Sequence, residues 1–301
     1  MTRNLYLGAD LRPLATVAPG PPFEQALAKI LAGVKAEDAN GRMKLVAREI
    51  ADAKPDLVGL QEMALWRTGP RPASRVAYDY LGAITAELRR LHQPYRVVAL
   101  ERGLDVEGPT GAGNDGRITL GDAILARKGV VVRHAHSALF ADQLRLPTRA
   151  VGPVVTNRGY DELDVTVHGV TAHVVNTHLE AYTTADRLAQ ANELIAGPLA
   201  SKLPTILLGD LNSGPSLPKP ADRPPYLALA AAGFTEARTP ELSCCYRKLT
   251  DTTGWDHNVD HIMTRPALAV VRSFVTGRET TAAGLHPSDH GGVVSVLQLP
   301  R

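Results

Sequence analysis

Acids, carboxamides and imidazoles occur in short polar clusters that are scattered over the whole chain. Most of these clusters end or follow an apolar run of the length expected for a buried strand. They are Asn4, Gln61-Glu62, Thr177-His178, Gly209-Asp210-Leu211-Asn212, Val259-Asp260-His261 and Ser288-Asp289-His290. Because the ends of adjacent strands can converge on one cleft, residues far apart in sequence can form one site. No serine or cysteine nucleophile lies in a local elbow, and the set suits metal-assisted attack of water on a phosphate ester.

The composition sets limits without choosing a substrate. With 44% apolar residues, the 301-residue chain can build a sizeable core. Its formal net charge of +2 and its 5% aromatic residues fall short of the basic excess and stacking side chains of dedicated nucleic-acid binders. Nucleic acid is therefore neither required nor excluded as a substrate.

The sequence shows no segment that would hold the protein in a membrane. No apolar run is long enough to span a bilayer, no hydrophobic hairpin for membrane docking stands out, and no signal peptide precedes Asn4. We therefore expect a soluble monomer without stable membrane insertion, cytoplasmic as written. If Asn4 belongs to a catalytic strand, that strand has almost no residues before it, so a start further upstream and export stay open.

The first half of the chain alternates helical and extended patterns. Apolar spacing predicts two helices within 23–54, broken near Asn40-Gly41, a third helix over about 74–91, and strands at 56–60 and 95–100. The segment 102–120 is rich in glycine and polar residues, which predicts a long mobile loop.

The second half mixes hairpins with helices. The expected strands are 123–126 and 130–133, paired as a hairpin, 163–167 and 172–176, paired as a second hairpin, and 205–208, 259–263, 267–271 and 293–299; the expected helices are 184–199 and 226–232. This order predicts an α/β (α+β) fold in which two mostly antiparallel sheets pack face to face with helices outside, a four-layer sandwich. We see no internal repeat and no linker, and we expect residues 1–301 to form a single catalytic domain.

The polar clusters, in their order along the chain, resemble those of the endonuclease/exonuclease/phosphatase superfamily. That family includes DNase I-like nucleases, inositol polyphosphate phosphatases and bacterial sphingomyelinases. One such cluster alone is a weak signal, but six in the family's order are specific and cover essentially the whole chain. The opening segment and residues 176–180 look most like uncharacterised bacterial members. The resemblance implies a DNase I-like fold and a metal-dependent phosphodiesterase, nuclease or phosphatase.

The resemblance also implies roles for the residues that handle the metal and the water. Glu62 is the expected ligand of Mg²⁺ or Mn²⁺, and Asp289 is expected near the ion. Asp210 would orient or deprotonate the attacking water. His290 would lie on the side of the nucleophile, with Asp260 hydrogen-bonded to its ring and supporting its positive charge.

A second group is expected to contact the substrate. The resemblance implies that Asn212 donates a hydrogen bond to a phosphate oxygen and that His178 acts as phosphate ligand or general acid. Asn4 is expected among the substrate-binding residues. Arg158 could contact phosphate or carry a solvated charge in a turn. Taken singly, each cluster is also compatible with an ordinary strand end or an Asx turn.

Three features depart from the family pattern or stay open. Tyr6 stands where the DNA-repair branch has an acid, which argues against a second metal. Asp122 stands where relatives often have asparagine, and its charge would disfavour an anionic substrate unless it is paired or metal-bound. Cys244 and Cys245 are adjacent, and we expect two plain thiols, with a disulfide between them as the alternative in an exported protein.

Other protein classes fit the sequence less well. A serine hydrolase needs a nucleophile elbow, and a dinuclear metallophosphoesterase needs histidine-rich signatures; neither is present. A non-catalytic module that binds a phosphorylated ligand on the same fold is the alternative to an enzyme. Nucleic acid, a phospholipid head group and a small phosphate ester all remain candidate substrates, and we expect segments such as 102–120 and 142–160 to select among them.

Overall fold

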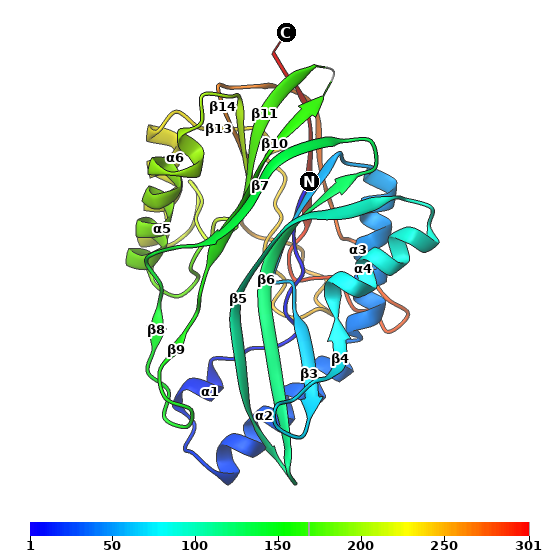
Figure 1. The fold of residues 1–301 in the computed structure, drawn as a ribbon, viewed down its shortest axis with the longest axis vertical. Helices are drawn as coiled ribbons and strands as arrows, with labels where there is room; N and C mark the ends of the chain where they lie inside the picture. Colours follow the sequence, from blue (N-terminus) through cyan, green and yellow to red (C-terminus); the bar gives the residue numbers. More distant parts are fainter. Residues whose placement is uncertain (168, 301) are drawn as a thin grey trace.

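Two β-sheets pack face to face, and helices cover their outer faces. The computed structural model describes residues 1–167 and 169–300 (Figure 1). Helices α3 and α4 lie on one side of the sheet pair and α5 and α6 on the other. Buried apolar side chains fill the space between the sheets and the space under the helices on each side. This is the predicted four-layer sandwich.

The first sheet has eight strands and holds the N-terminus. Along the sheet the order is β15-β16-β1-β2-β6-β3-β4, with β5 also paired to β6. The strands are β1 (Thr2–Asn4), β2 (Leu57–Gln61), β3 (Leu65–Gly69), β4 (Arg75–Asp79), β5 (Tyr95–Gly111), β6 (Asn114–Arg127), β15 (Ala269–Thr276) and β16 (Gly292–Gln298). Only β1 and β2 pair in parallel, so their carboxyl ends meet at one edge.

The second sheet has six strands in the order β13-β14-β12-β11-β10-β7. They are β7 (Val131–Leu139), β10 (Gly159–Val167), β11 (Val170–His178), β12 (Thr205–Asp210), β13 (Thr235–Glu236) and β14 (Asp260–Arg265). Here only β11 and β12 are parallel. A separate pair of short strands is formed by β8 (Arg145–Leu146) and β9 (Val154–Val155).

Six α-helices occur in the described ranges. They are α1 (Pro13–Thr16), α2 (Pro21–Ala36), α3 (Ala39–Ala53), α4 (Tyr80–Arg90), α5 (Thr184–Ala196) and α6 (Pro224–Ala231), and two short 3₁₀ turns span Pro198–Ala200 and Pro220–Asp222. Side-chain caps fix several of their starts: Asp38 accepts from the Gly41 amide, and Asp79 accepts from the Gly82 amide. None of these helices is long and apolar enough to cross a membrane.

Two predicted helix boundaries in the first half need correction, and one strand was missed. Residues 75–79 form β4, and the predicted helix over 74–91 begins only at Tyr80, because Asp79 caps it. The break within 23–54 falls at Glu37 and Asp38 rather than near Asn40-Gly41. Strand β3 was not predicted.

The segment 102–120 is not a loop but most of a long hairpin formed by β5 and β6. Its glycines have a packing role instead. A Cβ at Gly108 would lie 2.7 Å from Phe23 Cε1, and one at Gly116 would lie 2.8 Å from Leu31 Cδ1. The hairpin therefore needs glycine where it crosses α2.

The predicted hairpin of 123–126 with 130–133 is also wrong. The first segment belongs to β6 and pairs with β2 and β5, whereas the second begins β7 and pairs with β10 in the other sheet. Alternating polarity is the same for a hairpin and for a chain that crosses between sheets, so the pattern could not separate the two. The hairpin of β10 and β11 and the remaining predicted helices and strands are confirmed.

Arg42 of α3 is hydrogen-bonded to two chain segments that lie next to polar clusters. It is fully buried, and its Nη1 donates to the carbonyl oxygens of Leu5 at 3.2 Å and Pro287 at 2.9 Å. Its Nη2 donates to the Tyr80 hydroxyl at 2.9 Å. One side chain thus links the end of β1 to the segment that leads into Ser288.

Replacing this side chain should destabilise the fold. In Arg42→Met two buried carbonyl oxygens lose their donor, and each such loss costs about 1–3 kcal/mol. We expect the free energy of unfolding, measured by urea denaturation, to fall by about 3 kcal/mol. The exposed Arg89 offers a matched control, since Arg89→Met should change it by less than about 0.5 kcal/mol. Equal effects of the two substitutions would show that the Arg42 contacts do not stabilise the fold.

Candidate active site

The sequence-predicted site residues meet at one edge of the sandwich, where the parallel strands end. In the first sheet Asn4 pairs with Gln61, which precedes Glu62. In the second sheet Asp210 is paired with His178 on one side and with Asp260 on the other. Strand register therefore brings the ends of β1 and β2 together in one sheet, and the ends of β11 and β12 together with the start of β14 in the other.

Asn4 joins the two sheets through its carboxamide. Its Nδ2 donates to Asp210 Oδ2 at 3.0 Å and to Glu62 Oε1 at 3.2 Å. The other oxygen of Glu62 accepts from the Leu7 amide at 2.8 Å. Glu62 has a left-handed backbone with φ of 54°, a conformation that non-glycine residues adopt only where surrounding contacts hold it. Asn4 and Leu7 supply those contacts.

Asp210 lies at the centre of the network. Besides Asn4, the backbone amide of Asn212 donates to its Oδ1 at 2.8 Å. Burial, followed by the nearby Asp260, raises the pKa of Asp210 to about 6, although His290 and the two hydrogen bonds oppose the shift. A carboxylate with this pKa is ionised at neutral pH and is still basic enough to accept a proton.

His290 lies between carboxylates. Its Nδ1 is 3.0 Å from both carboxylate oxygens of Asp260, and its Nε2 is 3.8 Å from Asp210 Oδ2 and 3.9 Å from Asp289 Oδ1. Burial alone would lower the pKa of His290. The surrounding carboxylates, Asp260 first, outweigh burial and hold the pKa well above its ordinary value. The ring is therefore a proton donor at neutral pH.

His178 faces the opposite side of Asp210 and is neutral. Its Nε2 lies 3.5 Å from Asp210 Oδ2, and its Nδ1 lies 2.7 Å from Arg158 Nη1. Burial, then Arg158 and His290, lower the pKa of His178 well below its usual range. A guanidinium can only donate, so Nδ1 must accept, and the single ring proton is on Nε2, facing Asp210.

Hydrogen bonds and ion pairs connect all nine sequence-predicted site residues. Arg158 joins through His178, and Asp289 joins through His290. The sequence led us to expect that the Asn212 carboxamide binds phosphate. Its Nδ2 already donates one hydrogen bond to the Leu179 carbonyl at 3.0 Å. One N–H of that amide remains for a substrate.

The donors suitable for a divalent ion are the carboxylates of Glu62 and Asp289, which line the same cavity. Burial, followed by repulsion from Glu62, raises the pKa of Asp289, although His290 opposes the shift. A cation would relieve that repulsion, and carboxylate oxygens are ligands that Mg²⁺ prefers. The ligand atoms of Asp210, Asp260 and His290 also lie within 4.8 Å of one another. In that group, however, His290 and Asp260 already bind each other.

Asp122 also lines the cavity, as a neighbour of the site. It is buried, and burial, together with Glu101 and Asp161, raises its pKa well above the ordinary value. Burial and the nearby Asp161 raise the pKa of Glu101 to about 8, and burial raises the pKa of Asp161 to about 7. The raised pKa favours the uncharged form of Asp122, which lessens the expected conflict with an anionic substrate.

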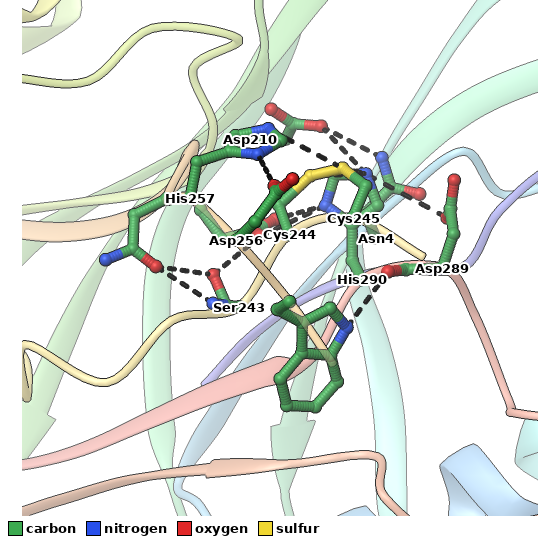
Figure 2. Close-up of a disulfide and its surroundings, with 12 residues drawn as sticks. Asn4, Asp210, Ser243, Cys244, Cys245, Asp256, His257, Asp289 and His290 are labelled. Atoms are coloured by element: carbon green, nitrogen blue, oxygen red, sulfur yellow. Dashed lines mark hydrogen bonds and ion pairs between the residues drawn. A yellow bond between two sulfur atoms is a disulfide. The ribbon is translucent and has the colours of Figure 1, made fainter. Parts of the chain in front are cut away.

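The segment around Cys244 was missed as part of the site. Ser243 Oγ donates to Asp260 Oδ2 at 3.0 Å, and Figure 2 shows Cys244 and Cys245 beside His290. The two sulfur atoms are bonded to each other, where the sequence predicted plain thiols, and they lie 3.7 and 3.5 Å from His290 Nε2.

The position of this segment depends on backbone hydrogen bonds between Cys244 and His257. These hydrogen bonds leave no periodic pattern in the sequence, so the sequence could not predict that the cysteines lie beside His290.

The comparisons with known proteins agree with this architecture. The model of the endonuclease/exonuclease/phosphatase family matches residues 26–290. No curated protein sequence matches the chain. Among solved structures, a mannosyl-6-phosphatase from Bacteroides thetaiotaomicron is similar at 16% identity and a TM-score of 0.59, over 99% of this chain and 98% of that one.

Two further structures show the same fold. TDP2 from D. rerio, complexed with a single-strand DNA product, is 16% identical with a TM-score of 0.57 and covers 86% of this chain and 92% of its own. A family protein from Leptotrichia buccalis is 15% identical with a TM-score of 0.59, over 86% and 93%. At these identities the likeness shows the fold, and it confirms the predicted DNase I-like architecture.

Proposed function

The chain belongs to the endonuclease/exonuclease/phosphatase family, and we propose that it is a hydrolase of phosphate esters that uses Mg²⁺ or Mn²⁺. Residues 1–301 act as one catalytic domain. The observation that carries this proposal is the hydrogen-bonded link from Glu62 through Asn4 to Asp210, with His290 on one side of Asp210 and His178 on the other.

Asp210 orients the attacking water and takes its proton. Its carboxylate is held by hydrogen bonds from the Asn4 carboxamide and the Asn212 amide, which fix the orientation it presents to the water. Its pKa of about 6 keeps it ionised at neutral pH. The water oxygen bonds to phosphorus, the bond from phosphorus to the leaving oxygen breaks, and that oxygen takes up a proton.

His290 acts as a donor rather than as the base. Asp260 holds its Nδ1, and Ser243 in turn holds Asp260. The charged ring directs Nε2–H toward the water side of Asp210, where it stabilises negative charge as it develops on the phosphoryl group. The sequence suggested an imidazole that could take a proton near neutral pH; the raised pKa of His290 favours the donor role instead.

The remaining polar groups bind the phosphate. His178 offers Nε2–H as a neutral donor, Arg158 supplies positive charge behind it, and Asn212 offers its second carboxamide N–H. Asn4, whose two N–H groups bind Glu62 and Asp210, borders the phosphate and holds those carboxylates in place. Donors fixed before the substrate arrives need no reorganisation during the reaction.

Glu62 and Asp289 are the residues that hold the metal. Both carboxylates face the same cavity, and Glu62 keeps lone pairs free because each of its oxygens accepts only one hydrogen bond. When bound, a divalent ion neutralises charge on the phosphoryl oxygens. The similar TDP2 structure holds a DNA product, and the similar mannosyl-6-phosphatase is named for a sugar phosphate. Nucleic acid and sugar phosphates are therefore candidate substrates here.

Two substitutions test the assigned chemistry. With bis-p-nitrophenyl phosphate and Mg²⁺, Asp210→Asn and His290→Ala should each lower kcat/KM by roughly 10²–10⁴-fold, the range for a positioned proton-transfer group. The exposed residues Asp52 and His136 provide controls, and Asp52→Asn and His136→Ala should keep wild-type activity. Unchanged turnover in Asp210→Asn would remove Asp210 from the mechanism. Absence of hydrolysis in the wild type would favour a binding module.

The metal assignment can be tested separately. EDTA should abolish hydrolysis, and added Mg²⁺ or Mn²⁺ should restore it. In Glu62→Gln the Mg²⁺ concentration that gives half-maximal activity should rise by at least about tenfold, since the charged ligand is lost. Full activity in EDTA, or a Glu62→Gln variant with the metal requirement of the wild type, would contradict the assignment.

A further inference from the structure

A large cavity begins at the candidate active site and extends away from it along the first sheet. Its volume is about 720 Å³, within the range of pockets that enclose a small organic ligand. Glu62, Asp289 and Arg158 line one part of it. The cavity is therefore open to the proposed metal ligands and to Arg158.

Most of the cavity wall is apolar. Three segments that are distant in sequence form it: α1 with the start of α2, the long β5–β6 hairpin, and the β8–β9 pair, which lie around the same end of the molecule in Figure 1. They contribute Leu14, Phe23, Leu104, Ile118, Leu146 and Val154, among others. Aliphatic side chains are the majority of this apolar lining, and the aromatic side chains are Tyr6, Phe23, Trp66 and Tyr182.

Several of these side chains have no role in the core. Leu14, Leu104, Leu146 and Val154 are only partly buried and belong to none of the hydrophobic clusters found in the described residues. Apolar surface of this kind is left in contact with water unless a ligand covers it, and covering it is favourable. The wall is thus suited to an apolar ligand group.

We infer that the substrate of this site is a phosphate ester with an aliphatic chain, held as a single molecule with its phosphate at Glu62 and Asp289 and its chain in the cavity. The inference rests on the proposed function, which it deepens by naming the substrate class. Charge supports the orientation, because Arg158, which lines the cavity beside His178, can attract the anionic end.

A nucleotide fits the same cavity less well. A base needs aromatic faces for stacking and polar groups for its edges. The part of the wall formed by Leu104, Ile118 and Val154 offers neither, although aromatic and polar side chains such as Trp66 and Asn157 line other parts of the cavity. A sugar would likewise leave its hydroxyl groups without partners there, at a cost for each buried polar group. An aliphatic chain has no such groups.

The test is a series of alkyl p-nitrophenyl phosphodiesters, from methyl to decyl, below their micelle concentrations and with saturating Mg²⁺. In the wild type kcat/KM should rise by about two- to fourfold per methylene until the cavity is full. The p-nitrophenyl ester of thymidine 5′-phosphate should be hydrolysed less efficiently than the octyl ester. A flat chain-length series, or a preference for the thymidine ester, would overturn the inference while leaving phosphodiester hydrolysis intact.

Two substitutions locate the effect in the cavity. Leu104→Trp on β5 and Val154→Trp on β9 enlarge side chains on different walls, and each should flatten the chain-length dependence. Val271→Trp is the control, since Val271 is 68% exposed and does not line the cavity. If the control and the cavity variants keep the same steep dependence, the chain does not bind there.

Binding without turnover separates this inference from the proposed function. By calorimetry with Mg²⁺ in the slow Asp210→Asn variant, octyl phosphate should bind at least tenfold more tightly than ethyl phosphate. A protein inactive on every ester would overturn the hydrolase proposal alone, and the two affinities would then decide the cavity. Equal affinities of the two phosphates would overturn the inference.

Discussion

The carboxamide of Asn4 is the contact on which the arrangement of the site depends, because it reaches from one sheet to a carboxylate of the other. It binds Glu62 within its own sheet and Asp210 across the interface. A second pair of carboxamides also joins the two sheets: Gln61 Nε2 of β2 donates to Asn176 Oδ1 of β11 at 2.7 Å. Gly59 permits this approach, since a Cβ there would lie 2.2 Å from the same oxygen. The face-to-face packing of the sheets and the geometry of the site are therefore set by the same buried polar contacts.

Electrostatics gives the two histidines different protonation states although both lie within 4 Å of Asp210. His290 is surrounded by carboxylates and stays charged, whereas His178 faces a guanidinium and stays neutral. Both can then donate a hydrogen bond, and Asp210 remains as the acceptor between them. Groups whose surroundings move their pKa values apart are a common basis for dividing acid and base roles.

Features that are encoded locally could be predicted from the sequence. Strand ends carry the polar clusters, so Glu62, His178 and Asp210 could be identified before their positions were known. Features that depend on distant segments could not be identified. The glycines of 102–120 suggested a loop because the helix that they pack against, α2, lies far earlier in the chain. The cavity is formed by three segments that are distant in sequence, and two of them include lining residues from 102–120 and 142–160, the segments expected to select the substrate.

The central claim is that Asp210, held between the sheets, accepts the proton of the attacking water. The pH dependence of kcat/KM for bis-p-nitrophenyl phosphate with saturating Mg²⁺ tests it most directly. Burial raises the pKa of Asp210 to about 6, so the carboxylate becomes protonated, and unable to act, as the pH falls through that value. We predict an acid limb with an apparent pKa near 6, below which activity falls tenfold per pH unit. Activity that stays level down to pH 4.5 would contradict the account.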